Sequence, residues 1–220
     1  TKGLFIEGAP IVEVDSVSRR GLDELVQKID EISEDIEEKK TDAPSRMSID
    51  RVFSLKGFGT IVTGTLIEGK ISVDDEMTIY PSEKKVKVRN LQVHGCDVKT
   101  AYAGQRTAIN LSNIKVSEIQ RGDVIAQTGS VEESMMIDVN ISLVEHCKKS
   151  LKHWDRIRVF HGTKQILCRI VPLNEDEIQY GESGYAQLRL EEKIVAKKGD
   201  RFIIRSYSPM DTIGGGVIID

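Results

Sequence analysis

The sequence lacks the features that mark membrane, secreted and metal-dependent proteins. No apolar run approaches the roughly 18 residues that a membrane-spanning helix requires. The first residues also lack the basic stretch followed by an apolar stretch that begins a secretory signal. The three cysteines, Cys96, Cys147 and Cys168, lie far apart, and the four histidines show no HExxH spacing. We therefore expect a cytoplasmic protein with reduced thiols, no disulfide framework and no metal site.

The motifs that bind nucleotide phosphates are also absent. The sequence contains no GxxxxGKS or GxxxxGKT, which would hold phosphates and Mg²⁺, and no NKxD, which would contact the base. Residues Asp211 to Gly214 (DTIG) do match DxxG, a pattern that approaches a γ-phosphate. They stand beside the last predicted strand without companion motifs, so we interpret them as a glycine-rich bend. We expect no catalytic residue and no cofactor within this chain.

The composition is that of an ordinary globular protein, with 39% hydrophobic and 30% charged residues. The net charge of −4 is unevenly distributed. Residues 1–44 carry 6 basic and 12 acidic side chains, residues 45–129 carry 12 and 9, and residues 130–220 carry 13 and 14. Only the middle segment is basic overall, which indicates where a nucleic-acid contact should be sought.

The first 44 residues predict a small strand-turn-helix unit. Residues 11–14 (IVEV) are typical of a short strand. A helix is predicted over residues 21–40, because apolar residues recur at helical spacing: Leu22, Leu25, Val26, Ile29, Ile32 and Ile36. Asp23 and Glu24 lie in its first turn and Lys39 and Lys40 in its last, as the helix dipole favours. Residues 41–45 (TDAPS) then form a linker, since proline cannot continue the helix.

After Ser45 the pattern changes to short runs rich in valine, isoleucine and threonine, separated by glycine turns. We expect strands near 47–55, 60–66, 76–80, 85–94, 105–111 and 122–127. A second series is expected near 135–144, 155–161, 165–171, 183–190, 200–206 and 213–219. One face of its first strand carries apolar residues at every second position: Ile137, Val139, Ile141 and Leu143.

Six short strands in about 80 residues, with no second amphipathic helix, favour a closed antiparallel barrel. The predicted fold class is therefore mainly β, with two consecutive closed antiparallel barrels after the strand-helix piece. The expected domains are residues 1–44, 45–129 and 130–220. Because the chain starts at Thr1 and stops directly after a strand at Asp220, we expect a piece of a longer protein.

Two long strings resemble a known family. Residues 50–81 (DRVFSLKGFGTIVTGTLIEGKISVDDEMTIYP) resemble the start of the second domain of translational GTPases such as EF-Tu, and residues 103–126 (AGQRTAINLSNIKVSEIQRGDVIA) resemble its end. The narrower resemblance is to the selenocysteine-specific elongation factors, the SelB family. It rests on DR at 50–51, VRNLQVHG at 88–95, AGQR at 103–106 and AQLRLEEKIVAKKGDRFIIRSYSPMDTIGGGVIID at 186–220.

The resemblance implies that residues 1–44 end a GTPase domain and that the barrels are domains II and III. The full-length protein would use GTP and Mg²⁺ to deliver selenocysteyl-tRNA to the ribosome at UGA codons. The messenger-RNA hairpin would be recognised only through C-terminal domains absent here, and no membrane is involved. Residues 14–25 (VDSVSRRGLDEL) resemble the last guanine-contact loop, with Ser16 in place and Val17 where the family usually has alanine.

The resemblance also assigns an aminoacyl pocket. Asp50 would take the α-amino group, while Arg51 and Arg106 would face the selenolate, an anion that needs fixed cationic donors. His94 would stack on the terminal adenine. The alternatives are that Asp50 and Arg51 form an ordinary surface pair, that Arg106 caps a strand, and that His94 is a partly buried strand residue.

Two basic groups are candidates for tRNA contact. The first comprises Lys84, Lys85, Lys87 and Arg89, which could instead form a solvated strand face. The second comprises Lys148, Lys149, Lys152, His153, Arg156 and Arg158 around Trp154. Charge with an aromatic ring suits an RNA arm. Alternatively, the tryptophan plugs one end of the barrel.

Three functions remain open from the sequence. The first is the nucleic-acid-binding part of a selenocysteine-specific elongation factor. The second is a piece of another EF-Tu-like GTPase that carries ordinary aminoacyl-tRNA or acts in initiation. Arg51 and Arg106 discriminate these two, because a neutral amino acid needs no paired cations. The third is a scaffold that docks proteins through its barrels, which fold alone would not decide.

Overall fold

The structure is a computed structural model that describes residues 7–37, 39–145 and 150–220. The chain separates into two compact units, Thr1–Glu38 and Lys39–Asp220. Among the described residues, no helix combines the length and the apolar character needed to cross a membrane.

The first unit contains one helix, α1 (Leu22–Glu34). It begins at Gly21, where φ is 76° and a Cβ atom would lie 2.2 Å from the carbonyl oxygen of Glu13. The helix is shorter than the predicted span of residues 21–40. Its last turn has no basic residue and is followed by Asp35 and Glu37, whose negative charges are unfavourable at a helix C-terminus. The predicted strand at residues 11–14 was wrong, because no described segment pairs with it.

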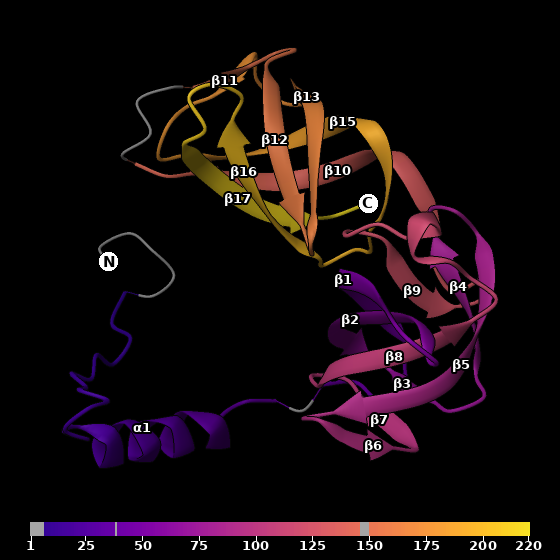
Figure 1. The fold of residues 1–220 in the computed structure, drawn as a ribbon. Coiled ribbons are helices and arrows are strands. Elements are labelled where there is room, and N and C mark those ends of the chain that lie inside the picture. The colour runs from indigo at the N-terminus through magenta and orange to yellow at the C-terminus, as the bar shows by residue number, and fades with distance from the viewer. Residues whose placement is uncertain (1–6, 38, 146–149) are drawn as a thin grey trace. The chain divides into compact units, whose positions relative to one another are not determined.

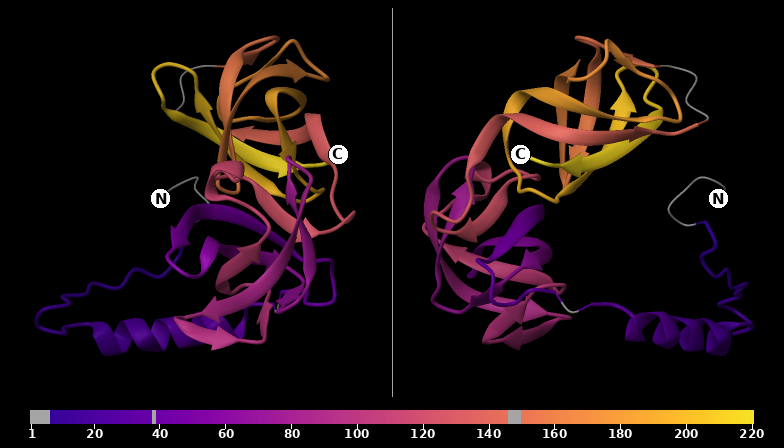
Figure 2. Two further views of the ribbon diagram at one scale, coloured as in Figure 1. Left: turned by 45° about the vertical axis from the view of Figure 1, so that its right-hand side comes forward. Right: turned by 180° about the vertical axis from the view of Figure 1, so that it is seen from behind.

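The second unit begins with a closed six-stranded barrel (Figures 1 and 2). All of its neighbours are antiparallel, in the order β4 (Glu76–Tyr80), β9 (Val124–Gln127), β1 (Arg46–Leu55), β2 (Gly59–Glu68), β8 (Arg106–Ser112) and β5 (Lys84–Val93), and β5 pairs back with β4. Short additional elements are β3 (Lys70–Ser72), β6 (Cys96–Val98), β7 (Thr100–Tyr102) and the 3₁₀ turn η1 (Val116–Glu118). Closure leaves these six strands without a free edge.

A second closed barrel follows, drawn in orange and yellow in Figure 1. Its order is β10 (Glu133–Leu143), β15 (Ser183–Val195), β13 (Lys164–Pro172), β12 (Arg156–His161), β16 (Arg201–Ser206) and β17 (Thr212–Ile218), which pairs back with β10. The short strands β11 (Leu151–Lys152) and β14 (Glu177–Ile178) pair with each other. The predicted fold class, with two consecutive closed antiparallel barrels, is confirmed.

Each barrel has its own apolar core. The predicted alternation on β10 is confirmed, because Ile137, Val139, Ile141 and Leu143 all point inward and are at most 5% exposed. A smaller third cluster contains Tyr80, Val124 and Ala126 from the first barrel together with Val131 and Val195. The two barrels therefore share an apolar contact in addition to their separate cores.

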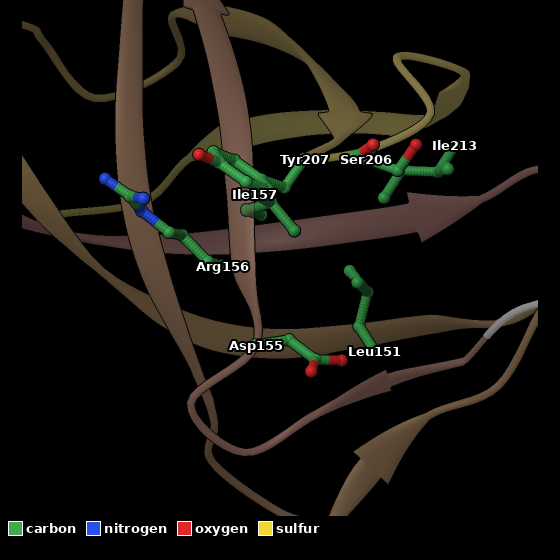
Figure 3. A pocket seen from close by; sticks show the side chains of 8 residues that line it. Leu151, Asp155, Arg156, Ile157, Ser206, Tyr207 and Ile213 are labelled. Atoms are coloured by element: carbon green, nitrogen blue, oxygen red, sulfur yellow. The ribbon is translucent and has the colours of Figure 1, made fainter.

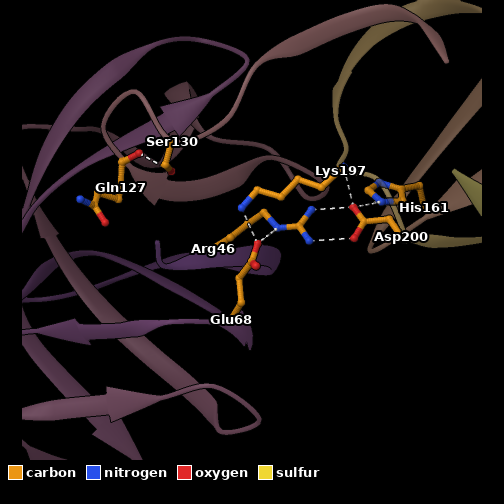
Figure 4. A network of polar contacts seen from close by, with 7 residues as sticks. All are labelled: Arg46, Glu68, Gln127, Ser130, His161, Lys197 and Asp200. Carbon is orange, nitrogen blue, oxygen red and sulfur yellow. Dashed lines mark hydrogen bonds and ion pairs between the residues drawn. The ribbon is translucent and has the colours of Figure 1, made fainter. Parts of the chain in front are cut away.

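A polar network also joins the barrels, as Figure 4 shows. The Arg46 guanidinium at the start of β1 donates to both carboxylate oxygens of Asp200, at 2.6 and 2.8 Å, and to Glu68 at 2.9 Å. Lys197 donates to the same oxygen of Glu68 at 2.7 Å, and the His161 ring nitrogen lies 3.0 Å from Asp200. Burial would raise the pKa of Asp200, but the bonds with Arg46 and His161 outweigh it and hold that pKa well below its usual value.

Candidate functional site

A β-bulge in β1 creates the first part of the site. Ile49 pairs with Gly64 and Arg51 pairs with Thr63, so Asp50 is an extra residue in the strand. Ile49 is buried, Arg51 is exposed, and Val52 packs against the core. Strict alternation would instead turn Arg51 into the core and Val52 toward solvent. The bulge therefore places two consecutive charged side chains, Asp50 and Arg51, on the outer surface of the barrel.

Asp50 is bound from two neighbouring strands. Both terminal nitrogens of Arg106, on β8, donate to its carboxylate, one of them at 3.1 Å. The Thr63 hydroxyl on β2 donates to the same carboxylate at 2.7 Å. The hydrogen bonds from Arg106 lower the pKa of Asp50, which keeps the carboxyl group ionised near neutral pH. A two-pronged arginine-carboxylate contact of this kind also fixes the orientation of both groups.

Arg51 supplies an additional positive charge beside this pair. Its charge contributes to the lowered pKa of Asp50. Within the described part of the chain, Arg51 forms no ion pair, whereas Arg106 is paired with Asp50. The three side chains therefore carry a combined charge of +1, and the unpaired guanidinium is available to an anion. The sequence-predicted trio does come together, across β1 and β8, around Asp50.

His94 lies next to Arg106 at a shallow hollow of about 230 Å³. Both residues line this hollow, together with Thr63, Gln92, Gly95, Thr107 and Ala108. His94 was expected in a strand, but it stands in the two-residue turn between β5 and β6 with φ 53°, and it is exposed. Gly95 follows with φ 79°, the conformation that such tight hairpin turns require. The alternative of a partly buried strand histidine was therefore wrong.

A second hollow of about 110 Å³ adjoins the first and shares Gln92 and Ala108 with it. Its remaining lining is apolar or carries an amide group: Leu55, Phe58, Ile61, Asn90 and Asn110. Phe58 is 59% exposed at the tip between β1 and β2, and Asn110 donates to its carbonyl oxygen at 2.8 Å. Apolar surface beside amide groups suits a flat heteroaromatic ring. Phe58 stands between Gly57 and Gly59, which is a hairpin-turn signal, and its sequence position alone does not mark it as a site residue.

The basic residues of β5 are divided in their contacts. Lys84 pairs with Glu118, and Lys87 pairs with Asp74 at 2.8 Å. Lys85 and Arg89 form no ion pair with any described residue and are exposed. Described carboxylates therefore neutralise Lys84 and Lys87, whereas the charges of Lys85 and Arg89 remain available.

An arginine-aromatic surface lies on part of the outside of the second barrel. Tyr207 is 45% exposed, and the guanidinium groups of Arg156 and Arg158 lie 4.8 and 5.2 Å from its ring centre. Figure 3 shows Tyr207 and Arg156 at the rim of a hollow of about 210 Å³ that Leu151, Ile157 and Ile213 also line. Arg156 is held by both oxygens of Glu191, at 2.8 and 2.7 Å.

The pairing of neighbouring strands places further arginines beside Arg156 and Arg158 on the same surface. Arg156 lies opposite Arg169, Arg169 opposite Arg189, and Arg158 opposite Arg205. Of these five, only Arg156 forms an ion pair with a described carboxylate. Sequence reasoning missed Arg169, Arg189, Arg205 and Tyr207. Their alternation within each strand was visible, but the lateral order β15, β13, β12, β16 that assembles them was not.

Trp154 does not plug the barrel. It is 47% exposed in the turn before β12, with its ring stacked on His153 at 5.8 Å and Arg189 at 5.6 Å from its centre. The plug interpretation was therefore wrong. Lys152 lies 3.5 Å from Glu177, while Lys148 and Lys149 fall outside the described residues.

The remaining sequence candidates are the guanine-contact residues Ser16 and Val17 and the DxxG match. Val17 is 93% exposed, and its N–H donates to the Asp15 side chain at 2.9 Å in a local turn that also contains Ser16. Gly214, the last residue of the DxxG match, lies within β17, where a Cβ atom would be 2.2 Å from the carbonyl oxygen of Ser142. This glycine allows β17 to approach β10. No described group of three or more histidine, cysteine, aspartate or glutamate side chains could hold a metal ion.

Two family models match the barrels. Residues 59–126 match elongation factor Tu domain 2, and residues 138–220 match the β-barrel domain of the selenocysteine-specific elongation factor. The order of these two domains along the chain is that of an EF-Tu-like translation factor.

Individual relatives agree with the family models. The chain is 39% identical over 99% of its length to the selenocysteine-specific elongation factor of Desulfomicrobium baculatum, of which it spans 34%. A crystal structure of a bacterial selenocysteine-specific elongation factor, EF-Sec, superimposes with a TM-score of 0.83 and 27% identity, covering 97% of this chain and 35% of that one. SelB from Methanococcus maripaludis, in complex with the GTP analogue GppNHp, gives a TM-score of 0.81 and 26% identity, covering 94% of this chain and 50% of that one. The chain belongs to the family of selenocysteine-specific elongation factors and spans about a third to a half of these relatives.

Proposed function

We propose that this chain contains the two tRNA-binding barrels of a selenocysteine-specific elongation factor. The full-length protein delivers selenocysteyl-tRNA to the ribosome at UGA codons, in the cytoplasm. Residues 1–44 end its GTPase domain, residues 45–129 form domain II, and residues 130–220 form domain III. GTP and Mg²⁺ bind to the part of the GTPase domain that precedes this chain, and recognition of the messenger-RNA hairpin belongs to domains that follow it. The similarity of the chain to selenocysteine-specific elongation factors supports this proposal.

The proposal is carried by one observation, the gathering of Asp50, Arg51 and Arg106 on the outer surface of the first barrel. A selenol ionises more readily than a thiol, so the selenocysteine side chain is an anion near neutral pH. Arg51 has no ion-pair partner among the described residues, and it offers the first attraction for that anion. The Asp50 carboxylate accepts hydrogen bonds from the α-amino group of the amino acid, which weakens its contact with Arg106. The Arg106 guanidinium then turns to the selenolate.

The adjoining hollows accommodate the end of the tRNA. The apolar surface of Leu55, Phe58 and Ile61 takes the ring of the terminal adenine, and His94 stacks at its edge. The amide groups of Asn90 and Asn110 supply hydrogen bonds to its edge. The two hollows share part of their lining and therefore lie side by side. This suits an aminoacyl group and the base of the nucleotide that bears it, which are also close together.

The rest of the acceptor arm contacts basic surfaces. The arginine-aromatic surface of the second barrel, with Tyr207 and Trp154, binds phosphates and sugar faces. Lys85 and Arg89 add charge on β5, and Lys84, Lys87, Lys148, Lys149 and Lys152 remain proposed contacts. These groups supply affinity that does not depend on the amino acid, whereas the Asp50 cluster supplies discrimination.

The test compares selenocysteyl-tRNA with seryl-tRNA, because the serine hydroxyl stays neutral. Arg51→Ala and Arg106→Ala are made in the full-length protein, and both dissociation constants are measured. A charge-assisted hydrogen bond contributes about 1.5–3 kcal/mol, so each variant should lose about ten- to a hundredfold of the preference. Arg121→Ala is the matched control, since it removes an exposed arginine of the same barrel that lines neither hollow. Equal losses for both tRNAs would make the arginines structural.

A further inference from the structure

The turn between β12 and β13 of the second barrel contacts β1 directly before the bulge. The Thr163 hydroxyl donates to the carbonyl oxygen of Ile49 at 2.7 Å. Its neighbour Gly162 approaches so closely that a Cβ atom there would lie 2.8 Å from the hydroxyl oxygen of Ser48. A side chain from one barrel therefore binds the main chain of the other at the residue that precedes Asp50.

Ile49 is fixed from several directions. Its N–H donates to the carbonyl oxygen of Asp123 at 2.8 Å, and its own carbonyl oxygen accepts from the N–H of Gly122 at 2.9 Å as well as from Thr163. Its side chain is fully buried in the core of the first barrel. The peptide group that joins Ile49 to Asp50 therefore has a defined orientation. Among the hydrogen bonds named here that fix it, the one from the Thr163 hydroxyl comes from the second barrel.

The same strand is tied to the second barrel once more, three residues earlier, by the bond between Arg46 and Asp200 (Figure 4). The two contacts with the second barrel therefore lie at Arg46 and Ile49, at either end of the segment that directly precedes the bulge. The bulge in turn decides which way Asp50 and Arg51 point, as the burial of Ile49 and Val52 on either side shows. A shift of the Ile49 carbonyl group is passed directly to the next residue, since a peptide unit is rigid.

We propose that Thr163 is a positioning residue of the selenolate pocket, by which the second barrel sets the direction of Asp50 and Arg51 in the first. The inference rests on the proposed function of that pocket and adds a residue that lies outside it. Without the hydroxyl, the Ile49 carbonyl loses one of its two bonds described above and keeps the bond from Gly122, and the peptide group before Asp50 gains rotational freedom. The guanidinium of Arg51 then samples directions that do not meet the bound anion.

The experiment uses Thr163→Val and Thr163→Ser in the full-length protein, with the dissociation constants of selenocysteyl-tRNA and seryl-tRNA as the readout. Valine removes the hydroxyl at nearly unchanged volume, and serine retains it. A neutral hydrogen bond corresponds to about a two- to tenfold effect, so Thr163→Val should lower the selenocysteyl preference by that factor. Thr163→Ser should retain the preference.

Thr60→Val is the matched control. The Thr60 hydroxyl also donates to a main-chain carbonyl oxygen at 2.7 Å, that of Ile114, but within the first barrel and not at the bulge. Thermal unfolding should show a similar loss of stability for both valine variants, while only Thr163→Val changes the preference. An unchanged preference in Thr163→Val, or an equal loss in Thr163→Ser or in Thr60→Val, overturns the proposal.

Arg106→Ala, measured alongside, separates this inference from the proposed function. If Arg106→Ala keeps the preference, the pocket assignment itself fails and the positioning role fails with it. If Arg106→Ala loses the preference and Thr163→Val keeps it, the pocket stands and only the positioning role is rejected.

Discussion

The buried ion pair between Arg46 and Asp200 makes a quantitative prediction about how strongly the barrels are coupled. The change Asp200→Asn keeps the size of the side chain and removes its charge. The Arg46 side chain is 5% exposed and the Asp200 side chain 16%, so the guanidinium would lose its main counter-charge in a largely dry environment. The loss also affects His161 and the main-chain N–H of Lys197, which both contact the same carboxylate.

The magnitude follows from the degree of burial. Removal of one partner from a buried ion pair typically costs about 3–5 kcal/mol, because the other charge remains buried. Arg46 keeps its bond to Glu68, and asparagine can still accept one of the two hydrogen bonds from the guanidinium. We therefore expect Asp200→Asn to lower the free energy of unfolding by about 2–3 kcal/mol, at or just below the lower limit of that range.

Urea denaturation of the 220-residue chain measures this loss, with circular dichroism for both barrels and fluorescence of the single tryptophan for the second. The matched control is Asp74→Asn. Asp74 forms a surface pair with Lys87 and its side chain is 77% exposed, so its loss should cost less than about 1 kcal/mol. A loss in Asp200→Asn no larger than that in the control would refute the reasoning.

The pH dependence of the same variant has a defined sign. The pKa of Asp200 is lowered in the folded protein, so its contribution to stability is present above the pKa of the unfolded chain, about 3.9, and is lost as the pH falls further toward the folded pKa. The difference in the free energy of unfolding between the parent chain and Asp200→Asn should therefore be largest near neutral pH and should decrease below about pH 4.

Three further predictions are independent of this network. Calorimetric titration of the chain with GTP and Mg²⁺ should show no saturable binding, because the phosphate and metal ligands are missing from its sequence. Gly64→Ala should destabilise the chain by more than about 2 kcal/mol in urea denaturation, since the added Cβ would lie 2.2 Å from the carbonyl oxygen of Ser48; a loss near zero would contradict this close approach. Arg158→Gln in the full-length protein should weaken selenocysteyl-tRNA and seryl-tRNA alike and reduce the salt dependence of both; a selective effect on either would exclude a phosphate contact.

The barrel architecture could be predicted because it depends on local patterns. Alternation such as that of Ile137 and Val139, and the glycine turns between the runs, are visible along the chain. The prediction of a strand at residues 11–14 was wrong because a strand also needs a neighbouring strand to pair with. A local sequence pattern does not show whether such a partner exists. The end of the helix at Glu34 reflects the acidic residues that follow it, whose charge outweighed the continuing apolar spacing.

The site was predictable in its residue types and not in its geometry. The trio of Asp50, Arg51 and Arg106 came from the resemblance, whereas the bulge that turns two adjacent side chains to one surface depends on the register between β1 and β2. The arginine surface around Tyr207 depends on the lateral order of four strands. The position of His94 could have been inferred from the glycine that follows it between two strand-like runs, which is a hairpin-turn signal.

The central claim is that two arginines distinguish a selenolate from a neutral hydroxyl. The most direct measurement is the ratio of the dissociation constants for seryl-tRNA and selenocysteyl-tRNA, in the full-length protein and in its Arg51→Ala/Arg106→Ala double variant. The account predicts that the double variant loses at least about a hundredfold of this ratio, while its affinity for seryl-tRNA changes by less than about tenfold. A double variant that retains the ratio of the parent protein would contradict the account.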